Sequence, residues 1–263
     1  MSIVTSVCAD YLWRIATTPA VIALRARASC LLGLGPGARV LDIGCGPGTT
    51  LAGLAAYVGP FGQITGVDHD AEMIRLAGVT AGQLGLGSLA RFQVADAAAL
   101  PFPDGGFDAC YCERVVQHLE PSATAAAVGE TVRVLRPGGT AVFAGSDWAS
   151  FSVATGENAI KRQLQKRHLG RFRNPFSARD LGRILREAGL GFVFTEPFAL
   201  ALSADAVATL LAGAEQDVLD AGALDAAEHA RWRTALASGR TDTAGHLTMV
   251  IAFGRRLTGG FTR

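Results

Sequence analysis

Short apolar runs alternate with segments of helical spacing along the first part of the chain. The runs stop at glycines or acids and lie at 39–43, 63–67, 90–95, 107–112 and 140–144. Apolar runs of this length, bounded by turn residues, are typical of buried strands, whereas apolar spacing of three and four indicates a helix. Strict alternation of the two predicts an α/β fold with a parallel, doubly wound sheet.

Helical spacing also predicts a two-part N-terminal region at 7–34, because Thr17-Thr18-Pro19 interrupts it with a cap (Thr18) and a first-turn proline. Beyond residue 146 the pattern weakens. It predicts a strand at 192–198 on the edge of the sheet and a last strand at 247–253. The other helices are expected at 49–58, 122–135, 157–173, 178–188 (capped by Ser177) and, as an alanine-rich pair, 204–238.

The stretch Arg39 to Leu51, RVLDIGCGPGTTL, is the most informative part of the chain. An apolar run ends in three glycines and is followed by a predicted helix. The glycines let the backbone approach a ligand closely, next to the free N–H groups at the start of that helix. A dinucleotide fingerprint needs a glycine where Thr49 stands, Pro47 removes an N–H, and the lysine of a P-loop is missing. Asp42 would repel a pyrophosphate and suits an ammonium or sulfonium group.

VLDIGCGPG resembles motif I of the class I S-adenosylmethionine (SAM) methyltransferases, and LPFPDGGFD (100–108) and LRPGG (135–139) resemble two further stretches of that family. The resemblance is specific over about 35–145 and thin to 255, where it is similar to bacterial small-molecule enzymes of the ubiquinone/menaquinone-biosynthesis-like group. It implies a Rossmann-like sheet of seven strands, mostly parallel with an antiparallel closing strand. It also implies SAM as cofactor, S-adenosylhomocysteine as product, a helical lid at 1–34, and a SAM-binding domain at 35–263 with lid insertions near 146–176 and 204–245.

Acids follow three of the predicted strands. Asp42 and the glycine turn are expected to hold the methionine end of SAM, Asp68 the ribose hydroxyls, and Asp96 the adenine amino group. For Met73, against the adenine ring, the alternative is ordinary core packing; for Glu113 it is a salt bridge with Arg114 or the N-terminal lobe. The predicted cofactor residues are Asp42, Gly44, Cys45, Gly46, Gly48, Asp68, His69, Met73, Asp96, Ala97 and Glu113.

His118 resembles the histidine of the "HHL" stretch in ubiquinone/menaquinone-type methyltransferases. We hypothesise that it is a general base; the alternative is that it packs its helix onto a loop. A base is needed only if the acceptor must lose a proton early, because methyl transfer from a sulfonium depends mainly on positioning. Candidate acceptor contacts are Tyr11, Arg14, Trp148 and His246, with helix packing or a structural role as the alternative for Tyr11, Arg14 and His246.

The predicted function is methyl transfer to O, N or C of a small apolar or aromatic metabolite, in secondary metabolism. The first rival is an RNA or protein methyltransferase, supported only by the basic segment 161–173, which is otherwise a solvated face. The second is a SAM-fold protein that catalyses a cyclisation without methyl transfer. A NAD-linked reductase is the third, and the glycine spacing speaks against it.

Composition narrows the setting. Hydrophobic residues make up 49% of the chain and charge is sparse, as in a well-buried globular protein, and a net charge of +1 makes nucleic acid an unfavoured partner. Five unpatterned cysteines indicate reduced thiols, a cytoplasmic location and no metal site. Neither a membrane helix nor a secretion signal is expected, and the enzyme is expected to be a monomer or homodimer.

Overall fold

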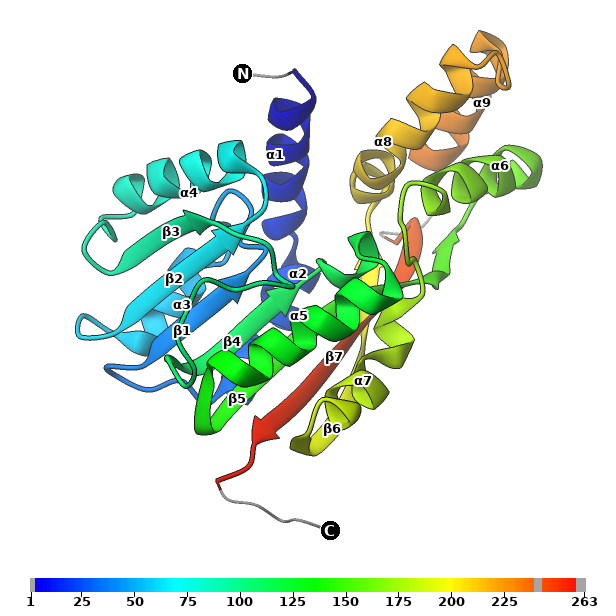
Figure 1. Ribbon diagram of the computed structural model, residues 1–263. Coiled ribbons are helices and arrows are strands. Elements are labelled where there is room, and N and C mark those ends of the chain that lie inside the picture. The colour runs from blue at the N-terminus through cyan, green and yellow to red at the C-terminus, as the bar shows by residue number, and fades with distance from the viewer. Residues whose placement is uncertain (1–2, 239–242, 259–263) are drawn as a thin grey trace.

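The computed structural model describes residues 3–238 and 243–258, with side chains from Ala9 onward. Its described strands form one sheet in the order β3-β2-β1-β4-β5-β7-β6 (Figure 1). β7 pairs antiparallel with both β5 and β6, whereas the other pairs are parallel. The predicted sheet with an antiparallel closing strand is therefore confirmed. The strands are β1 (Arg39–Ile43), β2 (Gln63–Asp68), β3 (Ala90–Val94), β4 (Phe107–Glu113), β5 (Leu135–Val153), β6 (Leu190–Leu202) and β7 (Gly245–Arg256).

Helices cover both faces of the sheet, with α2 and α3 over one and α5 and α7 over the other (Figure 1). Alternate residues of β1 show why: Val40 belongs to the core on the α2 and α3 side, and Leu41 to the core on the α5 and α7 side. The helices are α1 (Ile3–Ala16), α2 (Pro19–Leu32), α3 (Leu51–Val58), α4 (Ala71–Gln83), α5 (Pro121–Val134), α6 (Asn158–Leu169), α7 (Leu181–Glu187), α8 (Ala204–Asp220) and α9 (Ala226–Ala237), with short 3-10 turns η1 (Val116–His118) and η2 (Ser177–Asp180).

The helices α6, α8 and α9 gather beyond the ends of β5, β6 and β7 (Figure 1). Buried Glu215 of α8 accepts hydrogen bonds from Trp232 Nε1 at 3.0 Å and is 2.9 Å from His229 Nε2, which ties α9 to α8. Arg167 and Arg171, from the basic segment, both pair with Asp217 of α8. Part of the basic run therefore joins α6 to α8.

Three local expectations are wrong. β5 continues to Val153, well past the predicted end at residue 144, because it pairs with β7 as far as Asp147 and again at Ser152 and Val153. The Thr18 hydroxyl donates to Ile15 O at 2.8 Å and makes no capping hydrogen bond to α2; the Thr18 backbone N–H donates to the same carbonyl at 3.1 Å, so both donors of Thr18 close the end of α1. Ser177 does not cap α7, since η2 stands between them.

No single helix within residues 3–238 and 243–258 has the length and apolar character to cross a membrane. The segments Ala9–Ala16 and Pro19–Leu32 meet the criterion only as a pair, bent by 80°.

Candidate cofactor and acceptor site

The glycine turn after β1 lies where the strand order reverses between β1 and β4, the usual place for a ligand in such sheets. Gly44, Gly46 and Gly48 all have positive φ, at 71°, 53° and 84°. A Cβ on Gly44 would lie 2.1 Å from Val115 Cγ2, and one on Gly48 would lie 2.7 Å from Leu51 Cδ1. The turn thus needs glycine for both its backbone conformation and its close contacts.

The turn is folded back on the end of β2. Gly44 N and Cys45 N donate to Val67 O at 2.8 and 2.9 Å. Cys45 is buried, and burial raises the pKa of its thiol, so it is an uncharged wall of the turn.

Asp42 is buried on β1 and accepts a hydrogen bond from the Thr50 hydroxyl. Burial raises the pKa of Asp42 to about 7, opposed by the Thr50 hydrogen bond and assisted by the negative charges of Glu113 and Asp68. This hydrogen bond joins Asp42 to Thr50, the residue before α3. Its role against the methionine end of a cofactor stays a prediction.

Asp68 ends β2 and joins the glycine turn to the start of α4. Its carboxylate accepts from Gly46 N and from Asp70 N, each at 3.0 Å, and His69 Nδ1 lies 3.3 Å away. A carboxylate has about four acceptor positions, so it retains capacity for a ligand hydroxyl. Asp70 caps α4 by accepting from Glu72 N at 2.8 Å.

The adenine residues are placed one strand further on. Met73 is buried on α4, as both its predicted contact and its core alternative require. Asp96 is exposed just after β3 and accepts from Ala98 N at 2.8 Å, and Ala97 beside it is half-buried. Asp42, Asp68 and Asp96 thus lie at the carboxyl ends of three neighbouring strands, which fits a nucleoside laid across them.

Glu113, at the end of β4, is the centre of a buried ionic network. Arg25 of α2 binds its two oxygens at 2.8 and 3.0 Å, Tyr111 donates at 2.6 Å, and Arg114 Nε lies 3.3 Å away. Burial alone would raise the pKa of Glu113, but the charges of Arg25 and Arg114 lower it to about 2. The salt-bridge alternative for Glu113 is therefore observed, and its cofactor contact stays a prediction.

Arg25 was missed by sequence reasoning, although an arginine beside Leu24 on an apolar helix face was the available signal. It also donates to Thr49 O at 3.0 Å and thereby ties α2 to the glycine turn.

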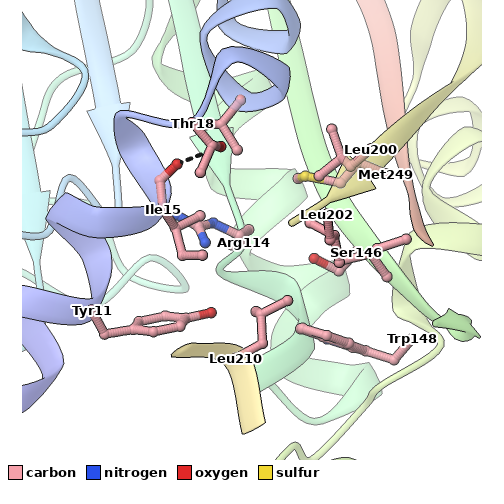
Figure 2. Close-up of a pocket in the computed structure, with 12 residues that line it drawn as sticks. Tyr11, Ile15, Thr18, Arg114, Ser146, Trp148, Leu200, Leu202, Leu210 and Met249 are labelled. Atoms are coloured by element: carbon pink, nitrogen blue, oxygen red, sulfur yellow. Dashed lines mark hydrogen bonds between the residues drawn. The ribbon is translucent and has the colours of Figure 1, made fainter. Parts of the chain in front are cut away.

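An apolar cavity adjoins this network (Figure 2). Its volume is about 20 Å³, room for about one water molecule. Tyr11 and Trp148 line it, whereas Arg14 and His246 are exposed residues outside its lining; a contact of Tyr11 and Trp148 with the acceptor stays a prediction. The lining residues are Tyr11, Ile15, Thr18, Val21, Arg114, Ser146, Trp148, Leu200, Leu202, Leu210, Leu247 and Met249.

Trp148 is held by its neighbours. Its Nε1 donates to Gln117 Oε1 at 3.1 Å, and its ring stacks on Phe172 with centroids 4.9 Å apart. His168 meets the same ring edge-on at 4.5 Å. Burial, helped by the charge of Arg171, lowers the pKa of His168 to about 4, so it is a neutral member of this aromatic cluster at pH 7.

His118 lies on η1, outside the cavity lining, with its ring centroid 5.4 Å from that of Phe172. Its Nε2 is 3.2 Å from the side-chain nitrogen of Gln117. Desolvation and the charge of Arg114 lower the pKa of His118, so the ring is neutral at pH 7 and able to accept a proton. The general-base hypothesis stays a prediction. Among the described residues no group of His, Cys, Asp or Glu is arranged to hold a metal ion.

Comparison with known proteins identifies relatives of this chain. Residues 40–139 match a family described as a methyltransferase domain. An uncharacterized 37.1 kDa protein in transposon TN4556 of Streptomyces fradiae is 34% identical over 248 residues, which cover 92% of this chain and 70% of that protein. A demethylmenaquinone methyltransferase of Beutenbergia cavernae is 36% identical over 156 residues, 58% of this chain and 56% of that protein.

Among solved structures, the [4+2]-cyclase SpnF superposes with a TM-score of 0.61 at 24% identity, covering 90% of this chain and 82% of that chain. That likeness concerns the fold alone. A seven-stranded sheet with this order, the glycine turn and the matching domain together define a class of enzyme fold. The chain belongs to the class I SAM-dependent methyltransferase family, in the group of small-molecule enzymes.

Proposed function

We propose that this chain is an enzyme that transfers a methyl group from SAM to O, N or C of a small apolar or aromatic molecule. The observation that carries the proposal is the glycine turn bound to Asp68 on one side of the switch point, next to an apolar cavity on the other. SAM, when bound, supplies a methyl group on a positively charged sulfur.

The residues of the chain have separate tasks in this proposal. Asp68 would accept the ribose hydroxyls, and Asp96 with Ala97 would bind the adenine. The turn Gly44–Gly48 admits the ligand to backbone contact because a side chain there would collide with Val115 or Leu51. The apolar cavity excludes water and aligns the acceptor, and alignment alone can contribute several kcal/mol, up to about 7–11 kcal/mol in well-oriented systems.

The cavity must widen to admit a metabolite, because about 20 Å³ holds about one water molecule. Its lining includes Tyr11 and Ile15 on α1 and Leu210 on α8, which are the walls that we propose must shift. We therefore assign the lid to the described parts of the predicted segments 1–34 and 204–245, with a contribution from 146–176 through Trp148; residues 1–2 and 239–242 of those segments lie outside the described residues. A cytoplasmic location and a monomeric or homodimeric state stay predictions of the sequence.

The test is a thermal-shift series with S-adenosylhomocysteine, SAM, NAD and NADP. A ligand at a hundred times its Kd stabilises by about 2.7 kcal/mol, so we expect a raised midpoint with the first two ligands. Asp68→Ala should weaken S-adenosylhomocysteine binding at least about tenfold, because it removes charge-assisted hydrogen bonds. Asp70→Ala is the matched control: it removes the cap of α4 and should leave affinity unchanged. A midpoint raised only by the nicotinamides would overturn the proposal.

The fold shared with SpnF makes a cyclisation without methyl transfer the second candidate. Product mass separates the two, since transfer adds a methyl group and cyclisation leaves the mass unchanged. An RNA or protein substrate is less favoured, because Arg167 and Arg171 of the basic segment are already paired with Asp217. A salt-sensitive mobility shift of RNA in the presence of the protein would instead support an RNA substrate.

A further inference from the structure

Arg114 is the one charged residue among the described residues that line the apolar cavity. The wall around it is built largely from Leu, Ile, Val, Met and Trp side chains, and none of its lining residues in the described part of the chain carries a carboxylate. A charge beside an apolar cavity is costly unless a partner compensates it. Its presence there calls for a partner.

Glu113 compensates Arg114 only in part. Arg114 has one ion pair, from its Nε to Glu113 at 3.3 Å, and Arg25 takes both oxygens of the same carboxylate. Two guanidiniums therefore share one carboxylate. Asp42, the other buried acid nearby, interacts electrostatically with Arg25. The terminal nitrogens of Arg114 donate no hydrogen bond to any residue in the described part of the chain, so its fork is open for a ligand.

The backbone of Arg114 is held in an unusual conformation. Its φ of 58° lies in the left-handed region, which is sterically unfavourable for a side chain of this kind. Its N–H donates to Ala144 O at 2.7 Å, which fixes the turn directly after β4. Strain of this kind persists where the surrounding structure enforces it, typically at binding sites.

Ser146 supplies a second donor from β5, the strand that pairs with β4. It is 1% exposed, and its hydroxyl is buried without a hydrogen-bond partner in the described residues. Buried hydroxyls are nearly always paired, so this one is available for a bound molecule. Figure 2 shows Arg114 between Ile15 of α1 and Ser146 of β5, in the space that Leu202 and Leu210 also border.

We propose that Arg114 and Ser146 select an apolar acceptor that carries one anionic oxygen, as a carboxylate, phenolate or enolate does. The inference rests on the proposed function, since it names the acceptor class of that same site. Arg114 binds the charge, Ser146 donates to the same oxygen group, and the apolar wall holds the remainder of the molecule. Glu113 is a positioning residue that orients Arg114 from behind.

The carboxylate of the cofactor is the competing partner for this guanidinium. The contacts separate the two arginines: Arg25 donates to Thr49 O beside the glycine turn, whereas Arg114 lines the cavity. None of the residues 44–48 borders that cavity. Arg25 is thus the guanidinium on the cofactor side, and Arg114 the one on the acceptor side.

The experiment uses calorimetry on the full chain saturated with S-adenosylhomocysteine, with 2-naphthoate and 2-naphthamide as probes. The two probes have nearly the same shape and differ in charge. The wild type should bind naphthoate at least about tenfold more tightly than the amide, as expected for charge-assisted hydrogen bonds. Arg114→Met should abolish this preference, Arg114→Lys should retain part of it, and Ser146→Ala should reduce it less. Arg114→Met and Arg114→Lys keep a side chain of moderate size, and Arg183→Met is the control at an exposed arginine of α7, outside the cavity and the lid segments.

Three results would overturn the inference. They are no preference for naphthoate in the wild type, a preference that survives in Arg114→Met, and failure of both probes to bind. A fourth result reassigns the arginine: if Arg114→Met weakens S-adenosylhomocysteine but not 5′-methylthioadenosine, which lacks the amino-acid part, Arg114 binds the cofactor carboxylate. Failure of the wild type to bind S-adenosylhomocysteine at all would instead refute the proposed function, so the two failures are distinguishable.

Discussion

The cofactor side and the acceptor side that we propose for this site differ in how they are built. The cofactor side consists of a glycine turn and acids at the ends of β1, β2 and β3, all within two successive strand–helix units and the strand that follows. The acceptor side is assembled from α1, α2, β5, β6, α8 and β7, with Arg114 from the turn after β4. Backbone conformation defines the first, and side chains brought together from distant parts of the chain define the second.

Glu113 connects the two sides through its ion pairs. Through Arg25 it reaches the glycine turn, and through Arg114 it reaches the cavity. The difference between the two sides teaches that a ligand-binding turn can be recognised locally, whereas an acceptor pocket depends on where the helices of the lid are placed.

Removing the charge of Glu113 should have the largest effect on stability. Glu113→Gln leaves the buried guanidiniums of Arg25 and Arg114 without a countercharge and should lower the free energy of unfolding by about 3–5 kcal/mol. Arg27 lies on α2, as Arg25 does, and pairs at the surface with Glu196 of β6. Glu196→Gln removes that partner and should lower the free energy of unfolding by about 1 kcal/mol or less. Urea unfolding of both variants measures the difference. Equal losses would show that Glu113 does not join the two sides energetically.

The same variant carries a pH signature. Because the folded-state pKa of Glu113 lies at about 2, below its ordinary value of 4.5, its stabilisation is complete above pH 4.5 and is lost as the pH falls toward 2. The stability gap between the wild type and Glu113→Gln should therefore narrow through that window.

The cofactor side can be tested without touching the acceptor side. Gly44→Ala adds a Cβ 2.1 Å from Val115 Cγ2 at a φ of 71°, whereas Gly85→Ala meets nothing within 4 Å at a φ of 69°. Gly85→Ala measures the backbone cost alone, about 1–2 kcal/mol. Gly44→Ala should cost about 1–3 kcal/mol more through overpacking, and it should weaken S-adenosylhomocysteine binding. Calorimetric titration and urea unfolding check the two parts, and equal behaviour of the two variants would contradict the close packing of the turn.

The smallest effect is expected for His118→Ala. The ring lies outside the cavity and contacts Phe172 and Gln117, so S-adenosylhomocysteine affinity should stay within about twofold of the wild type. Isothermal titration provides the measurement, with His246→Ala as the control at an exposed histidine of β7. A kcat lowered by about 10²-fold or more would support the base hypothesis, whereas a large loss of cofactor affinity would contradict this placement of the ring.

The sequence by itself determined the alternating fold and the three acids at neighbouring strand ends, because each depends on local periodicity or on residues next to a turn, whereas the antiparallel closing strand was expected only from the resemblance to the methyltransferase family. It also named Tyr11 and Trp148 as candidate acceptor contacts, which stays a prediction. Ser146 could not be found in this way, since nothing in its immediate neighbours distinguishes it from a packing residue. Arg25 left only the signal of an arginine on an apolar helix face, and Arg114 was named only as a possible salt-bridge partner of Glu113. Only the tertiary structure decided their roles, because the burial, charge balance and missing partners that define them arise when α2, β4 and β5 come together.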